Sequence, residues 1–319
     1  MVRIVAMPMV MAIVISGFTA AGWARAAGAG VDIDTAATLY LAAEIRQQVR
    51  ASLGQMPGQI RKMFEHDSTA KLSDDEVAAI TKAAERGFRI DVFEAPALSA
   101  LAQHLDPATV AKTEAFLASD LGKRMVADDV ASATMGQENI DKVMNGELTA
   151  PSNPKRDAVF EKIEKAAHST QSTVDIFLGM GEAVAVGTAI GSGLDRAGVA
   201  ERAKRSGEAG RAELENGMRV PMRRFLAYSY RDLSDSDLKQ LLSFLESHAG
   251  ARYVAAYNAS MGAGFDAMGQ RTGERLGESL RELAQAKLDR PVRESPSADS
   301  PAPDAPPPAI AAPPAPQTH

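Results

Sequence analysis

Cysteine is absent from this chain of 319 residues, and tryptophan and histidine are scarce, with one Trp and five His. The lack of Cys excludes disulfide bridges, thiolate metal ligands and a lipid-modified cysteine. A di-metal site in a helical bundle needs two Glu–His pairs at helical spacing and two further Glu. The nearest approach is Glu164 with His168, and it has no second copy. We therefore expect no metal ion and no cofactor.

Motifs of the common hydrolases are also missing. The chain contains no Gly-x-Ser-x-Gly elbow for a nucleophilic serine and no His-Glu-x-x-His zinc motif. A hydrolase stays open only as a second alternative, because a Ser–His–Asp triad has no fixed sequence pattern. The formal net charge is −6, which argues against a general nucleic-acid binder, since phosphate recognition needs a basic face.

The N-terminus has the pattern of a secretion signal. Arg3 is followed by the apolar stretch 4–18, and Ala24-Arg25-Ala26 offers a small-x-small cleavage site. The apolar stretch is short for a membrane span, which needs roughly 20 residues. We expect residues 1–26 to be removed after Ala26, giving a periplasmic or secreted protein with no integral membrane span.

The C-terminus is dominated by proline and alanine. Ten of the 29 residues in 291–319 are Pro, and such a segment cannot build a packed core. We expect a disordered tail, which could act as a spacer.

Three well-marked helix starts predict an all-α fold. Ser73, Asp106 and Ser234 each stand at a helix N-cap position, with a leucine before the cap and an apolar residue shortly after it. No segment shows the sustained alternation of a β-strand. A last helix is expected from about Gly273 to Arg290, ahead of Pro291.

Two stretches 128 residues apart align without a gap over 22 positions, residues 105–126 and 233–254. Each contains a capped helix, then Phe-Leu-x-Ser-x-x-Gly-x-Arg, read as Phe116 to Arg124 and Phe244 to Arg252. The likeness predicts a tandem repeat of a helical-bundle unit. Gly, Pro, Ser and Asn cluster in 146–154, which places repeat 1 at 32–148 and repeat 2 at 155–290.

The repeated motif supplies the candidate interaction surface. Its Phe and Leu belong in a core, so the residues left to contact a partner are Lys123, Arg124, His248 and Arg252. We expect these side chains to bind another protein of the cell envelope. The sequence does not identify this partner.

The second candidate is the Gly-rich segment 176–194, which has a single charged residue, Glu182. Gly187 and Gly191 form a small-x-x-x-small pair, which lets two helices pack closely. We expect a buried packing helix here; membrane contact and a ligand-lined cavity are the alternatives. The last of these would make the protein a carrier of an apolar ligand such as a lipid.

The Phe-Leu-x-Ser-x-x-Gly element, preceded by a capped Leu-rich helix and a signal peptide, resembles the secreted bacterial domain-of-unknown-function 2059 family. That family carries Phe-Tyr-x-Ser-Pro-x-Gly at this point, and both copies here keep its Phe, Ser and Gly. The resemblance implies a helical fold, no established activity and no catalytic residues. Together these observations predict a non-enzymatic binding or interaction module of the envelope.

Overall fold

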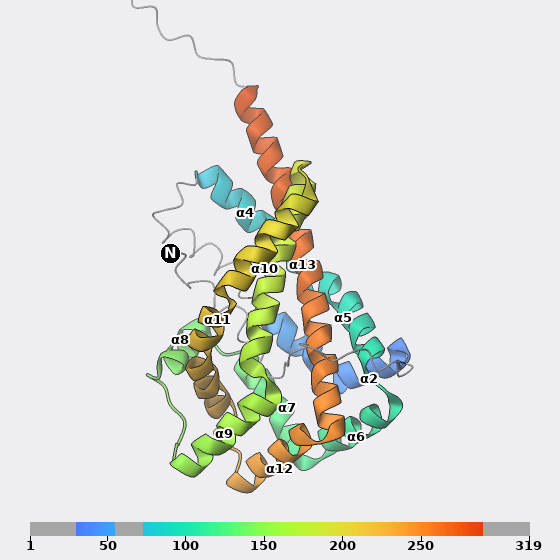
Figure 1. Ribbon diagram of the computed structural model, residues 1–319, viewed down its shortest axis with the longest axis vertical. Helices are drawn as coiled ribbons and strands as arrows, with labels where there is room; N and C mark the ends of the chain where they lie inside the picture. Colours follow the sequence, from blue (N-terminus) through green and yellow to red (C-terminus); the bar gives the residue numbers. More distant parts are fainter. Residues whose placement is uncertain (1–29, 55–72, 290–319) are drawn as a thin grey trace, which may run out of the picture.

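The computed structural model describes residues 30–54 and 73–289, and all regular structure in them is α-helical. The prediction of an all-α fold is confirmed for this part of the chain. The expected signal at 1–26 and the expected tail at 291–319 lie outside the described residues. Figure 1 shows most of the short helices gathered at one end of the molecule and three long helices running away from them, with α4 beside the long helices.

The helices are α2 (Ile33–Ala42), α4 (Asp74–Gly87), α5 (Ile90–His104), α6 (Pro107–Ala118), α7 (Asp120–Ala133), α8 (Gln137–Asn145), α9 (Pro154–Ala167), α10 (Ser169–Ser192), α11 (Arg196–Ser229), α12 (Asp235–Glu246) and α13 (His248–Leu288). Residues 45–54 are helical as well.

The three predicted helix starts are confirmed by their hydrogen bonds. Ser73 and Glu76 form a reciprocal capping box at the start of α4. The Asp106 carboxylate accepts the Thr109 backbone N–H at 2.8 Å at the start of α6. Ser234 forms the second capping box, at the start of α12. Each cap satisfies N–H groups that the first turn of a helix leaves without an intrahelical partner.

The α13 helix corrects the expected break near its middle. The helix predicted from about Gly273 is the last part of α13, which runs unbroken for 41 residues. Gly weakens an isolated helix, but Gly269, Gly273 and Gly277 lie where α10 crosses at close range.

The two halves of the chain, 32–148 and 155–290, share their cores. One apolar cluster joins Phe93 and Leu101 of the first half to Tyr257 and Phe265 of the second. The other joins Ile140 of the first half to several side chains of the second half. Phe116, Met125 and Phe244 are partly buried and pack against both clusters. Neither half therefore buries its apolar face without the other.

The three long helices form a stalk, which we define as residues 178–192 of α10, 196–214 of α11 and 266–288 of α13 (Figure 1). Glycines bring α10 and α13 into backbone contact. A Cβ atom on Gly187 would lie 2.1 Å from the Gln270 carbonyl oxygen, and one on Gly191 would lie 2.1 Å from that of Glu274. Gly273 faces the Val184 carbonyl oxygen in the same way. Gly187 and Gly191 are thus packing residues, buried between two helices.

The α10 helix is long and apolar enough to cross a membrane, with a mean hydropathy of 1.5 over an 18-residue window. A third of that window is buried against the rest of the protein. A long core helix has the same length and composition. In the structure its glycine face is occupied by α13.

Candidate functional site

The repeated motif folds into the same helical corner in both halves. Ser119 ends α6 and accepts the Gly122 N–H at 3.1 Å to begin α7. Ser247 does the same for α13, accepting the Gly250 N–H at 3.0 Å. The glycines are needed because a Cβ atom would lie within 2.1 Å of the carbonyl oxygen of Phe116 or, for Gly250, 1.9 Å from that of Phe244. Serine therefore starts the second helix and glycine lets it fold back on the first.

The aligned phenylalanines of the two corners meet. The Phe116 and Phe244 rings are parallel within 1°, and their centroids are 3.9 Å apart. These residues occupy the same position of the repeated motif, 128 residues apart in the chain. In a two-fold symmetric interface a residue near the axis contacts its own equivalent. The two corners contact each other in this pattern, but within one chain.

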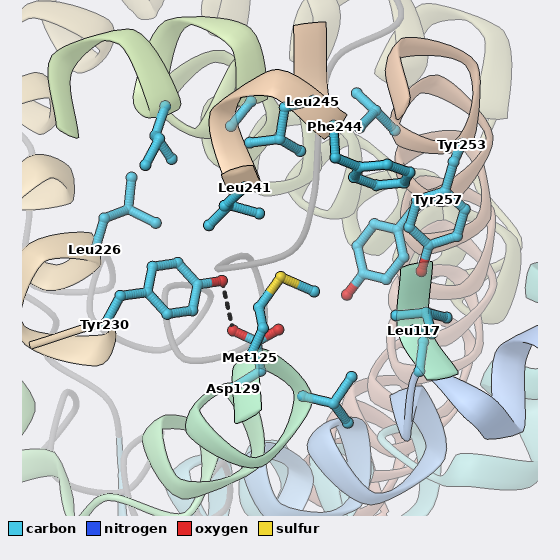
Figure 2. Close-up of a pocket in the computed structure, with 15 residues that line it drawn as sticks. Leu117, Met125, Asp129, Leu226, Tyr230, Leu241, Phe244, Leu245, Tyr253 and Tyr257 are labelled. Carbon is cyan, nitrogen blue, oxygen red and sulfur yellow. Dashed lines mark hydrogen bonds between the residues drawn. The ribbon is translucent and has the colours of Figure 1, made fainter. Parts of the chain in front are cut away.

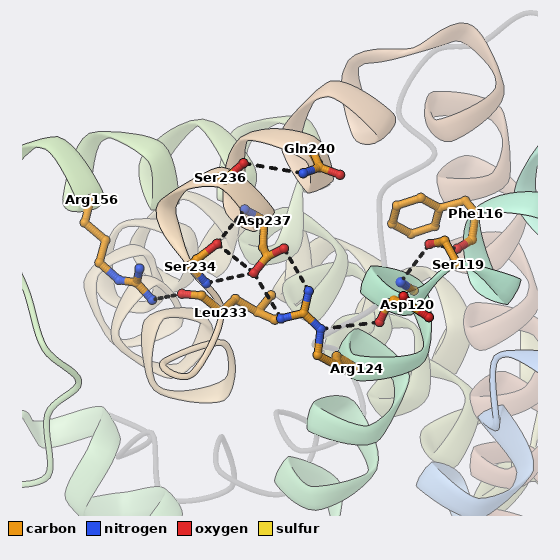
Figure 3. Close-up of polar contacts among 11 residues, drawn as sticks. Phe116, Ser119, Asp120, Arg124, Arg156, Leu233, Ser234, Ser236, Asp237 and Gln240 are labelled. Carbon is orange, nitrogen blue, oxygen red and sulfur yellow. Dashed lines mark hydrogen bonds and ion pairs between the residues drawn. The ribbon is translucent and has the colours of Figure 1, made fainter.

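Each of the two aligned arginines pairs with an acid of the other corner. Arg124 of the first corner makes a two-pronged ion pair with Asp237 of the second, at 2.8 and 3.0 Å (Figure 3). Arg252 of the second corner lies 2.8 Å from the Asp106 carboxylate of the first, at an angle that makes an ion pair without a hydrogen bond. Both carboxylates stand at the start of a helix, Asp106 at the N-cap of α6 and Asp237 in the first turn of α12, where the helix dipole favours negative charge.

The carboxylates are placed by two versions of one helix cap. Asp106 is itself the N-cap, and its carboxylate also accepts the Thr109 hydroxyl at 2.8 Å. In the second half Ser234 is the N-cap and donates to Asp237, three residues on, at 2.7 Å. The hydrogen bond from Arg124, followed by those from Ser234, lowers the pKa of Asp237 well below its usual range. In the first half the acid is the N-cap and the hydroxyl residue follows three positions later, whereas in the second half the order is reversed. Both arrangements place a negative charge at the start of a helix.

The four predicted interaction residues are therefore divided. Arg124 and Arg252 join the two halves of the chain. Lys123 is exposed and lines a shallow depression beside Glu44. His248 is exposed at the first position of α13. No single surface of the described residues gathers all four.

An open groove of about 630 Å³ runs beside the stacked phenylalanines. Arg124 and Asp237 lie along it, together with polar side chains of α6 and α12 (Figure 3). Its lining residues include Lys112, Phe116, Ser119, Asp120, Gln240, Ser243 and Phe244. The groove thus has an aromatic floor and charges of both signs.

Phe244 also lines a second, smaller and less open space between the two halves, with a volume of about 40 Å³. Helices of both halves supply its apolar wall, shown in Figure 2. The lining side chains are Ala43, Leu117, Met125, Val126, Asp129, Ile163, Ala167, Leu226, Tyr230, Leu241, Phe244, Leu245, Tyr253, Val254 and Tyr257. We call this space the junction cavity. Phe244 lines both this space and the groove.

Asp129 of α7 is the one acidic side chain of the junction cavity wall, and it is 3 % exposed. The Tyr230 hydroxyl donates to it at 2.8 Å (Figure 2). Burial raises the pKa of Asp129 to about 7, although the Tyr230 hydrogen bond acts in the opposite direction. A carboxyl with this pKa exchanges its proton near neutral pH, and such groups often belong to functional sites.

Tyr230 is held in place through its backbone. It ends α11, and its carbonyl accepts from the Arg156 guanidinium at 3.1 Å. The same nitrogen donates to the carbonyls of Arg231 and Leu233, and Arg156 pairs with Asp235 at 3.0 Å. A cation at the C-terminus of a helix is favoured by the helix dipole. The buried arginine thus fixes the turn from which Tyr230 reaches Asp129.

The sequence contained a local sign of Asp129 that pattern reading missed. Val126, Asp129 and Ala133 follow one another at helical spacing, and all three are buried on the same face of α7. An acid at an apolar position of a helix is costly to bury unless it is paired. The three tyrosines had no such sign, because they come from distant parts of the chain.

Three of the five histidines, His104, His168 and His248, lie in the described part of the chain. His104 is exposed, and its ring nitrogen lies 2.8 Å from the Ala100 carbonyl oxygen. Glu164, which with His168 is the nearest approach to a di-metal pair in the sequence, is buried and accepts the Thr170 hydroxyl at 2.6 Å. Among the described residues, no three His, Asp or Glu side chains are grouped so that they could hold a metal ion.

Comparison of this chain with protein-family models, curated proteins and solved structures finds no match. The resemblance to the domain-of-unknown-function 2059 family and the tandem repeat therefore stay predictions. The site is built from the chain's own residues, and its geometry brings together Phe116 with Phe244 and Asp129 with Tyr230.

Proposed function

We propose that this protein is a non-enzymatic binding protein of the cell envelope, and that it binds a small ligand at the junction of its two halves. The observation that carries the proposal is the junction cavity beside Phe244, with the open groove lined by the same side chain. Ligand sites in proteins are mostly apolar and contain a few well-placed polar groups. The junction cavity has this composition.

Its size favours a small ligand over a lipid. A volume of about 40 Å³ is room for roughly three water molecules, since one needs about 10–15 Å³ on this measure. A lipid chain does not fit this volume, so carriage of a lipid would require the helices to separate. The carrier function is proposed in this narrower form, for a ligand of a few atoms.

The chemistry of the wall supports binding rather than catalysis. Asp129 and three tyrosines are the titratable side chains among its lining residues, and the rest are apolar. General acid–base catalysis needs groups placed on a reacting bond, and a nucleophile needs a base beside it. Asp129 has instead a single tyrosine donor that holds it in place.

The envelope location in this proposal rests on the sequence of residues 1–26, with its apolar stretch and its Ala24-Arg25-Ala26 site. Fractionation of cells that express the full chain tests it. We expect the protein in the periplasm or the medium, with Ala27 as its first residue. A cytoplasmic protein that keeps Met1 would contradict the location.

Native mass spectrometry of the protein isolated gently from its own envelope fraction tests the binding function. We expect a small adduct that leaves on denaturation, and its loss in Ala167→Val. Ala167 lines the junction cavity at the end of α9, so the added methyl groups fill the space that the ligand needs.

Ala97→Val is the matched control, because Ala97 is fully buried in the core and is not among the junction cavity's lining residues. We expect this variant to retain the adduct while it loses about 1–3 kcal/mol of stability from overpacking. A bare mass for the wild type, or equal adducts in wild type and Ala167→Val, would contradict the proposed function.

A further inference from the structure

The buried Asp129 carboxyl lacks a cationic partner. None of the described arginines, lysines or histidines forms an ion pair with it, and its neighbouring charge is a second acid, Asp128. Buried acids elsewhere in proteins are paired, because an isolated carboxylate in an apolar site is costly.

The wall opposite the acid is aromatic. Phe244 of α12 and Tyr253 and Tyr257 of α13 lie across the junction cavity from Asp129 and Tyr230 (Figure 2). The Tyr253 and Tyr257 rings are 6.2 Å apart and tilted by 57°. Aromatic rings attract cations through their π-systems, most strongly where water is excluded. The junction cavity therefore combines a lone carboxyl with four aromatic side chains.

We propose that the junction cavity binds a small protonated amine, whose ammonium group pairs with the Asp129 carboxylate among the surrounding aromatic side chains. This inference rests on the proposed function and names the chemical class of its ligand. The ligand supplies the positive charge that the protein itself does not place at Asp129. A neutral molecule of the same shape gives no such compensation.

The volume sets the size of the amine. Room for roughly three water molecules matches three non-hydrogen atoms, which is the size of ethylammonium. A longer alkyl chain would leave the junction cavity past Phe244 and lie in the groove.

Binding of the amine depends on pH through the groups that face it. Asp129 comes from α7, Tyr230 from the end of α11, and Tyr253 and Tyr257 from α13, while α9 and α12 contribute apolar side chains. Asp128 lies outside the wall, and its charge raises the pKa of Asp129. The pKa of Asp129 is about 7, whereas an alkylamine keeps its proton to about pH 10. Affinity for the amine should therefore rise as the pH rises from 5 to 8.

The test is an NMR titration of the mature chain with ethylammonium chloride, with ethanol and sodium chloride as the neutral and ionic controls. Asp129→Asn removes the charge and leaves an amide oxygen to accept the Tyr230 hydroxyl. Asp128→Asn removes the neighbouring charge outside the junction cavity wall. Circular dichroism confirms that both variants are folded.

We expect saturable binding of ethylammonium to the wild type and to Asp128→Asn, and at least tenfold weaker binding to Asp129→Asn. Ethanol should bind no more tightly to the wild type than to Asp129→Asn. Equal ethylammonium affinity in all three proteins, or no saturable binding to the wild type, overturns the amine assignment. A native adduct that is not an amine also overturns it, while the proposed function of the junction stands.

Discussion

Helices pack in opposite ways in the stalk and at the junction, the region where the two halves of the chain meet. In the stalk, Gly187 and Gly273 let two backbones touch, so no side chain fits between them. In the junction, large rings and charged side chains meet across the halves, and a small space remains between them. The comparison indicates that close packing makes the stalk rigid, whereas the junction leaves room for a ligand. Substitutions should therefore affect stability in the stalk and ligand binding in the junction.

The largest effect is expected from Gly187→Leu in the stalk. Its Cβ atom would lie 2.1 Å from the Gln270 carbonyl oxygen, and the α13 backbone cannot move away locally. We expect a loss of at least about 3 kcal/mol in the free energy of unfolding, measured with denaturant. Gly181→Ala is the control, because its Cβ atom meets nothing within 4 Å, and it should be neutral or stabilising by up to about 1 kcal/mol.

This substitution also separates two predictions for the Gly-rich helix. Unfolding of Gly187→Leu or Gly191→Leu supports tight packing against α13. A folded variant that has lost a bound ligand would instead place a ligand site along α10. It would contradict the contrast between stalk and junction.

The next effect is the pH dependence of stability in Asp129→Asn. The Asp129 pKa is about 7 in the folded protein, against an ordinary value of 3.8 for an exposed aspartate. Between these values the folded state holds a proton that the unfolded state has lost, so wild-type stability falls as pH rises. At about 1.4 kcal/mol per pH unit, Asp129→Asn should exceed the wild type by a few kcal/mol at pH 8. The difference should vanish near pH 4.

Chemical denaturation at pH 4, 6 and 8 measures this difference. Asp128→Asn serves as the control for the general loss of one negative charge on α7. If the wild type were more stable than Asp129→Asn at pH 8, the carboxylate would have a cationic partner in the folded protein. It would then not need the charge of a cationic ligand.

A smaller effect is expected at the helix caps of the two corners. Ser119→Ala and Ser247→Ala each remove one hydrogen bond to a glycine N–H, which costs about 1 kcal/mol. Thermal unfolding of the single and double variants should show similar losses for the two sites. A large loss of stability at one cap and none at the other would mean that the aligned corners do not contribute equally to the stability of the fold.

The smallest effect is expected from the exchanged ion pairs. Arg124 is half exposed, with 50 % of its side chain accessible, and exposed ion pairs contribute about 0–1 kcal/mol. Arg124→Ala and Arg252→Ala should each lose less than about 1 kcal/mol, and less at high salt. If a loss of several kcal/mol were measured by denaturation, the arginines rather than the aromatic core would hold the junction.

Local patterns in the sequence predicted the helices and their caps. The predicted helix caps form the expected hydrogen bonds at Ser73, Asp106 and Ser234. They could be predicted because a cap depends only on the next three residues. The length of α13 was not predictable in this way. Its internal glycines are unfavourable for an isolated helix. The approach of α10 explains Gly269, Gly273 and Gly277, and Phe93 of α5 packs against Gly264.

The junction could be predicted only in part. The repeated motif pointed to Phe116, Phe244, Arg124 and Arg252, but not to the fact that the two copies contact each other. The meeting of Asp129 with Tyr230, 101 residues away, depends on how the halves are packed. Long-range pairing of this kind leaves no periodicity in the sequence. The lone acid on the apolar face of α7 was the one local sign of it.

The most direct test of the contrast is a crystal structure determined under xenon pressure. Xenon enters dry apolar cavities and leaves packed interfaces empty. We expect one xenon site behind Phe244, beside Leu117 and Ile163, and none between α10 and α13. Xenon between the stalk helices, or a junction whose side chains have closed over the space, would contradict the account.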